Sequence, residues 1–126
     1  MKVTKPSDIR IGDYVIIDKN IVRVTMVDEN EGVRSGLLSF ASWKGLEAPS
    51  LDDSFFEKND FKRSVRGGVV TYSLGKDEVW CKATKRERYY DVKIHNRVYS
   101  YNGPIDNLNE FFHALDACAI EPTFSL

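Results

Sequence analysis

Two short runs rich in β-branched and aromatic residues, joined by a polar turn, open this chain. The first run covers residues 8–17, the second covers residues 21–27, and the polar residues 18–20 separate them. In the second run Arg23 and Thr25 alternate with apolar residues, which is the period of a strand with one buried face. The pattern therefore predicts a β-hairpin that begins a small twisted barrel of the SH3-like kind.

Further along, short apolar runs alternate with turn residues, which indicates a β-rich α+β fold. We expect a third strand over residues 33–41, a short helix from a capping box at Ser50 and Asp53 to residue 59, and strands over residues 70–74, 79–83, 89–95 and 98–101. The short turns between the later strands leave no room for crossover helices, so these strands are predicted to form an antiparallel meander.

A C-terminal helix is predicted to begin after Asn107 and to end before Pro122. Its apolar residues recur at spacings of three and four, which gives one apolar stripe that can cover a sheet face. The members of this stripe are Leu108, Phe111, Phe112, Leu115 and Ala119. The helix is therefore expected to pack on the sheet and to close the core.

The chain is long enough, at 126 residues, to bury a core without metal or disulfide staples. We expect one compact domain over residues 1–126, with an SH3-like barrel and short helix in residues 1–66 and a meander plus helix in residues 67–126. The paired glycines Gly67 and Gly68 are the expected joint, because glycine tolerates backbone angles that other residues avoid.

Charge is distributed in blocks along the chain although the net charge is only −1. Residues 1–57 carry 7 basic and 10 acidic side chains, residues 58–98 carry 11 and 5, and residues 99–126 carry none and 4. The N-terminus lacks the apolar segment of a signal peptide, and two cysteines are too few for a disulfide framework. We therefore expect a cytoplasmic protein without a membrane segment.

The sequence offers no pattern typical of a reaction centre. It contains no nucleophile elbow, no phosphate-binding glycine loop and no dinucleotide fingerprint. The soft metal ligands lack paired spacing, so we expect neither metal nor cofactor; these ligands are Cys81, His95, His113 and Cys118. We expect no enzyme, although a triad assembled from distant residues stays open.

Binding is the remaining class of function, and the basic block is where we expect it. The block mixes cationic and aromatic side chains, as small barrels do when they bind single strands. The candidate binding residues are Trp80, Lys82, Lys85, Arg86, Arg88, Tyr89, Lys93 and Arg97. The first expectation is a non-enzymatic protein-binding or structural module, including self-association. The alternative is single-stranded nucleic-acid binding through residues 58–98.

Three stretches, at residues 11–15, 46–51 and 105–115, carry a resemblance to a known family. They read Ile-Gly-Asp-Tyr-Val, Leu-Glu-Ala-Pro-Ser-Leu and Ile-Asp-Asn-Leu-Asn-Glu-Phe-Phe-His-Ala-Leu. The order of hairpin, short helix, meander and aromatic helix resembles small proteins from Bacteroides-type bacteria and their phages and prophages, a family without an assigned activity. Asp106 stands where that family places His. The resemblance implies a phage or mobile-element setting, with the protein either in the cytoplasm of the host cell or associated with a virion.

Overall fold

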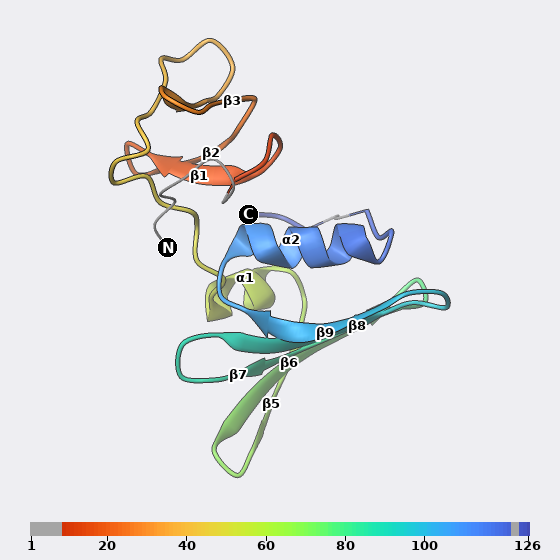
Figure 1. The fold of residues 1–126 in the computed structure, drawn as a ribbon. Coiled ribbons are helices and arrows are strands. Elements are labelled where there is room, and N and C mark those ends of the chain that lie inside the picture. The colour runs from red at the N-terminus through yellow and green to blue at the C-terminus, as the bar shows by residue number, and fades with distance from the viewer. Residues whose placement is uncertain (1–8, 122–123) are drawn as a thin grey trace. The chain divides into compact units, whose positions relative to one another are not determined.

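The structure, a computed structural model, describes residues 9–121 and 124–126 of the chain. Residues 1–8, with the start of the first predicted run, and residues 122–123, with Pro122, lie outside this description. The described residues contain nine strands, all paired antiparallel, and two helices, which confirms the β-rich α+β class (Figure 1).

The chain divides into two compact units. The N-terminal unit comprises the described residues up to Ser50 together with Asn107–Asn109, and the C-terminal unit comprises Leu51–Asp106 and Glu110–Leu126. The chain thus passes between units at Ser50, and Gly67 and Gly68 form a hairpin turn inside the second unit. The expected joint at the paired glycines was wrong, because the residues before them pair with the residues after them.

Two separate hairpins make up the N-terminal unit. Its strands are β1 (Tyr14–Ile17), β2 (Asn20–Arg23), β3 (Met26–Asp28) and β4 (Gly32–Arg34). The predicted β1–β2 hairpin is confirmed, with Asp18 and Lys19 at φ 49° and 67° in its turn. The described strands form two two-stranded sheets that do not close into a barrel, so the SH3-like barrel is not confirmed.

The second predicted run is split between two strands because the backbone changes partner within one residue. The Val24 N–H donates to the Asp13 carbonyl at 2.7 Å, whereas the Thr25 N–H donates to the Arg34 carbonyl at 2.8 Å. The expected strand over residues 33–41 was also too long, since β4 ends at Arg34 and only Ala41 returns to pair with Val33.

Asn109, which belongs to the N-terminal unit, forms two hydrogen bonds with the backbone of β1. The Tyr14 N–H donates to Asn109 Oδ1 at 2.7 Å, and Asn109 Nδ2 donates to the Tyr14 carbonyl at 2.8 Å. The side-chain amide thereby bonds β1 as a neighbouring strand would.

The N-terminal unit has a small hydrophobic core of its own, which includes the buried side chains of Val15, Val24 and Val33. This core is what makes the N-terminal unit compact.

A five-stranded antiparallel sheet forms the body of the C-terminal unit. Its strands, in spatial order, are β5 (Lys62–Arg66), β6 (Val69–Lys76), β7 (Val79–Lys85), β8 (Tyr90–His95) and β9 (Ser100–Ile105). The predicted meander is confirmed for β6 to β9. Strand β5 was not predicted: every residue in it is exposed, so it carries no apolar alternation.

Helix α1 (Asp53–Lys58) is the predicted short helix, but its start differs from the prediction. Asp52 is the N-cap, and its carboxylate accepts from the Phe55 N–H at 3.1 Å. Ser50 instead pairs with Asn107 in an isolated bridge. The expected Ser50 capping box was therefore wrong, because Asp52 already supplies the acceptor that the first turn needs.

Helix α2 (Leu108–Ala117) confirms the predicted C-terminal helix. It ends in a Schellman motif: the Ile120 N–H donates to the Leu115 carbonyl, the Ala119 N–H donates to the Asp116 carbonyl, and Ala119 has φ 54°. Neither helix of the described chain has the length and hydrophobicity that crossing a bilayer requires.

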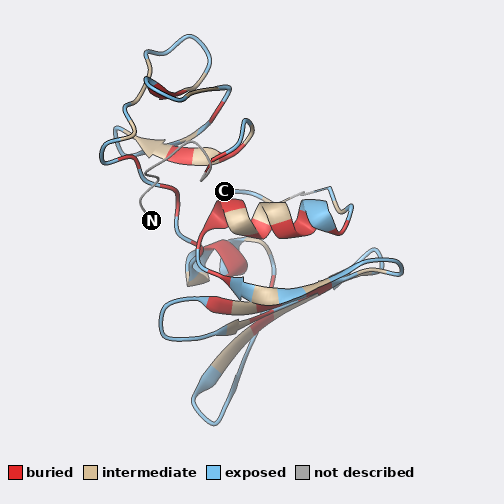
Figure 2. Ribbon diagram, viewed as in Figure 1, coloured by how far each residue is buried: buried red, intermediate tan, exposed pale blue. Residues whose placement is uncertain are grey.

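Both helices cover the same face of the five-stranded sheet (Figure 1), and buried residues of the helices and strands lie between them (Figure 2). Many of these buried residues are aromatic and contact one another. Phe56 is fully buried and stacks on Tyr72 with ring centroids 5.0 Å apart. Phe111 of α2 contacts Phe55 and Phe56 edge-on. Neither helix of the described residues lies on the other face of the sheet, and most side chains on that face are exposed.

Candidate functional site

The uncovered face of the sheet, here called the outer face, is defined by the strand register. Directly paired residues of antiparallel strands point to the same side of a sheet. Two rows of paired residues lie on the outer face. The basic row is Lys62, Ser73, Lys82, Lys93 and Asn102, and the aromatic row is Gly75, Trp80, His95 and Ser100. The two rows are adjacent on every strand that they share.

The aromatic row offers a stacked pair of rings to solvent. Trp80 and His95 lie on neighbouring strands with ring centroids 4.9 Å apart and planes only 17° from parallel. Trp80 remains 44% exposed although it is a large apolar side chain. On its other side stands Gly75, where a Cβ would lie 3.3 Å from Trp80 Cδ1. The glycine therefore leaves room for the indole and keeps that side clear of side chains.

The basic row concentrates positive charge that the protein does not neutralise. Lys82 and Lys93 are directly paired across β7 and β8, both are exposed, and neither forms an ion pair with another described residue. Like charges directly opposite each other destabilise a sheet. Lys62 adds a third cation in the same row. This arrangement lowers stability in the free protein and favours an anionic ligand.

A cavity of about 560 Å³ opens where the two rows meet. This volume lies within the range of ~300–1,000 Å³ that is usual for small-ligand sites. Its lining includes Asp60, Lys62, Gly75, Trp80, Lys82 and Lys93. The cavity combines an aromatic wall, three cations and one carboxylate, which is the chemistry that a nucleotide or another flat anionic ligand needs.

The structure brings three of the predicted binding residues together: Trp80, Lys82 and Lys93 share the outer face. Three others form ion pairs: Lys85 with Asp53 at 2.9 Å, Arg86 with Asp91 at 2.7 Å, and Arg97 with Glu78. Arg88 and Tyr89 lie in the turn between β7 and β8. The predicted set is therefore spread over the sheet, and only part of it forms one surface.

Lys85 belongs to a polar network on the opposite side of the sheet. It pairs with Asp53 of α1, whose carboxylate also accepts a hydrogen bond from the Tyr90 hydroxyl. The Tyr90 hydrogen bond, helped by Lys85, lowers the pKa of Asp53 below its usual range. Burial, followed by the hydrogen bond to Asp53, raises the pKa of Tyr90. This network holds α1 on the sheet, so Lys85 stabilises the fold and is not free to contact a ligand.

Sequence reasoning missed Lys62 and His95 as members of the site. Period-two alternation from Lys93 would have placed His95 on the outer face. The sequence has no comparable signal for Lys62. Strand β5 has no apolar alternation, and only the structure shows that it pairs with β6 and that Lys62 lies opposite Ser73.

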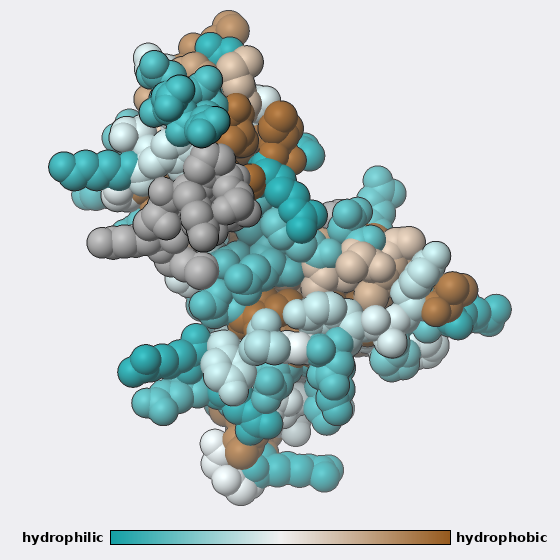
Figure 3. Space-filling view, viewed as in Figure 1, coloured by the Kyte–Doolittle hydropathy of each residue, from teal (hydrophilic) through white to brown (hydrophobic). Residues whose placement is uncertain are grey.

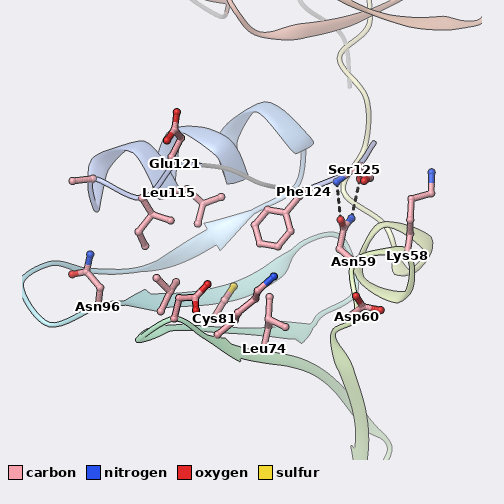
Figure 4. A pocket seen from close by; sticks show the side chains of 15 residues that line it. Lys58, Asn59, Asp60, Leu74, Cys81, Asn96, Leu115, Glu121, Phe124 and Ser125 are labelled. Carbon is pink, nitrogen blue, oxygen red and sulfur yellow. Dashed lines mark hydrogen bonds between the residues drawn. The ribbon is translucent and has the colours of Figure 1, made fainter.

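A second cavity, of about 510 Å³, lies between the inner face of the sheet and the end of α2 (Figure 4). Phe124 and Leu115 point toward Cys81 across it, and the Asn59 amide bonds both backbone groups of Ser125 at its mouth. Burial raises the pKa of the Cys81 thiol to about 12. The thiol stays protonated near neutral pH, so Cys81 is not activated as a nucleophile.

Metal-binding groups do not converge in the described part of the chain. Within residues 9–121 and 124–126, no three or more His, Cys, Asp and Glu side chains are placed to hold a metal ion. Cys81 and Cys118 are both buried and unbonded to each other. The outer-face cavity is therefore the site with the clearest binding chemistry.

Comparison of the chain with protein-family models, with curated proteins and with solved structures gave no significant match.

Proposed function

We propose that the outer face of the five-stranded sheet binds single-stranded nucleic acid. The observation that carries the proposal is the exposed Trp80–His95 stack beside a row of three lysines that form no ion pair with any described residue. Proteins that bind single strands combine a cationic surface for the backbone with aromatic side chains for the bases. Both parts occur here on one face of one sheet.

In the proposed complex the aromatic row stacks on the bases and the basic row contacts the phosphates. Bases stack on aromatic faces whatever their identity, and each stacked base contributes about 1–3 kcal/mol. Lys62, Lys82 and Lys93 neutralise phosphates and release counterions, which supplies a salt-dependent part of the affinity. An open sheet face suits an extended single strand, because the bases of such a strand are unstacked and accessible.

A binding experiment with intrinsic fluorescence tests the proposal. The chain has two tryptophans, Trp43 in the N-terminal unit and Trp80 on the outer face. Titration with a single-stranded oligonucleotide at low salt is expected to quench the wild-type emission, since a base stacks on Trp80. In Trp80→Ala the remaining Trp43 emission should not change. Fluorescence anisotropy of the labelled strand should show at least about tenfold weaker binding for that variant.

Tyr99→Ala is the matched control. Tyr99 is 50% exposed and lies in the β8–β9 turn outside both rows, so its loss should leave the affinity near that of the wild type. Two results would refute the proposal: no saturable binding of single strands by the wild type, or equal affinity of wild type and Trp80→Ala.

A second proposed function is non-enzymatic protein binding, including self-association. It is favoured by apolar side chains that loops expose: Leu37 and Leu38 are 104% and 56% exposed in the N-terminal unit. Exposed apolar groups of this kind mark interaction surfaces when they cluster. Figure 3 draws further hydrophobic side chains in brown at the tips of the β5–β6 and β8–β9 hairpins. Sedimentation of wild type against a Leu37→Ser, Leu38→Ser variant tests self-association: a mass that depends on concentration only in the wild type supports it.

Two further proposals accompany these functions. The SH3-like layout of the N-terminal unit rests on the predicted hairpin and its bend. The phage or mobile-element setting in Bacteroides-type bacteria rests on the resemblance in residues 11–15, 46–51 and 105–115. Genes for phage or mobile-element functions beside the coding gene would support that setting, and an unrelated neighbourhood in every genome would contradict it.

A further inference from the structure

The outer-face cavity is lined by a carboxylate as well as by lysines, and a surface that binds any single strand does not need that carboxylate. Three lysines lie along one row, whereas Asp60 lines the cavity from the turn between α1 and β5. A carboxylate repels phosphate, so Asp60 works against any ligand that presents only a phosphate backbone. Its presence beside the lysines indicates that a different part of the ligand, one with hydrogen-bond donors, faces it.

The two sides of the Trp80 indole differ in what covers them, and a further ring can stack only on the β6 side. His95 covers the β8 side of the Trp80 indole, and Gly75 flanks its β6 side with backbone alone. The cavity of about 560 Å³ touches the indole, Gly75 and Asp60. Asp60 lines this cavity and also the inner-face cavity. We place a base on Trp80 over Gly75 with its hydrogen-bonding edge toward Asp60 and its sugar and phosphate toward the lysines, because this pose pairs donors with the carboxylate and the negative charge with the cations.

We infer that this cavity is a base-specific slot that prefers guanine within a single strand, a proposal that rests on the proposed nucleic-acid binding. An ionised aspartate only accepts hydrogen bonds, through two oxygens. The Watson–Crick edge of guanine presents two adjacent donors, its ring N–H and its amino group, whereas adenine, cytosine and thymine each present a single donor group beside acceptors. Guanine alone satisfies both carboxylate oxygens, and bases are read on this edge when they are splayed out of a strand.

Competition between bases in one strand context tests the inference with the full chain. The probes are fluorescein-labelled oligo(dT) and the same strand with one central dG, dA or dC. The wild type is expected to bind the dG strand about tenfold more tightly than the others, as a bidentate contact provides. In Asp60→Asn this ratio should fall to within about twofold, because the amide offers one acceptor and one donor. Removing a negative charge raises the affinity for every strand alike, so the ratio of the dG affinity to the other affinities is unaffected by this general gain.

The chain offers a closely matched control for this substitution. Asp60 has φ 64° and Asp77, in the β6–β7 turn, has φ 53°. Asparagine adopts this left-handed conformation readily, so both substitutions should preserve the fold. Asp77 does not line the outer-face cavity, and Asp77→Asn should keep the full preference for dG. Equal melting temperatures of the three proteins establish that the comparison concerns binding.

The possible failures are distinguishable. Tight binding of all four strands with equal affinity would overturn the base-specific slot and leave the proposed function intact. Absence of binding to every strand would overturn both. Guanosine monophosphate is the last probe: binding as tight as that of the dG strand would identify a free nucleotide as the ligand and overturn the single-strand assignment.

Discussion

The basic row makes a quantitative prediction about salt. The perturbation is the triple substitution of Lys62, Lys82 and Lys93 by Gln, which removes the charge and keeps a polar side chain. The row crosses three strand-to-strand steps, a span of about 14 Å, so the three ammonium groups reach separate phosphates. Each neutralised phosphate of a single strand contributes about −0.7 to the slope of log affinity against log salt.

These values give the expected magnitude. Three contacts produce a slope of about −2, so the wild-type affinity should fall about twentyfold between 50 and 200 mM salt. Lys82→Gln alone should reduce that fall to about sevenfold, and the triple variant should be almost insensitive to salt. The assay is fluorescence anisotropy of a labelled oligo(dT) in a salt series, with the affinity determined at each concentration.

Lys44→Gln is the control, since Lys44 is exposed in the N-terminal unit and should leave the slope unchanged. A triple variant with the wild-type slope would refute the assignment of the phosphate path to the basic row. Weaker binding with an unchanged slope would refute it equally, because loss of phosphate contacts must lower the slope.

Three further predictions concern stability and reactivity. Phe56→Ala should lower the free energy of unfolding by about 3–5 kcal/mol in urea denaturation, because Phe56 is fully buried among other rings; a loss below about 1 kcal/mol would contradict this. Since the pKa of Asp53 is lowered in the fold, its contribution to stability is complete above the pKa of an unfolded Asp, about 4, and is lost as the pH falls through the folded value. Asp53→Asn should flatten the wild-type decline of melting temperature in that acidic range, and an unchanged decline would exclude Asp53 as its source. With its pKa raised to about 12 by burial, Cys81 should resist iodoacetamide at pH 8 in the folded protein and react after unfolding, as followed by mass spectrometry.

The local pattern of the chain was sufficient to predict several elements. Alternation and turn residues located the β1–β2 hairpin and the strands from β6 to β9, and the three-and-four spacing located α2. These predictions succeeded because strand and helix periods are imposed by backbone geometry within one segment. Alternation along β7 sets Trp80 and Lys82 on one side of that strand, and the pairing of Lys82 with Lys93 brings the β8 lysine to the same side.

Long-range pairing decided the rest. Lys62 joins the basic row only because β5 pairs with β6 in this register. Lys85 is paired with Asp53 only because α1 packs beside β7, so Lys85 does not belong to the outer face. The barrel expected at the N-terminus did not close, since the chain changes strand partner between Val24 and Thr25. The sequence by itself thus determined the β1–β2 hairpin, the strands β6 to β9, the presence of both helices and the alternation of side chains along those strands, whereas β5 and the bounds of β3 and β4 escaped it. The tertiary structure determined which strands are neighbours and which charges are paired, because those depend on contacts between residues far apart in the chain.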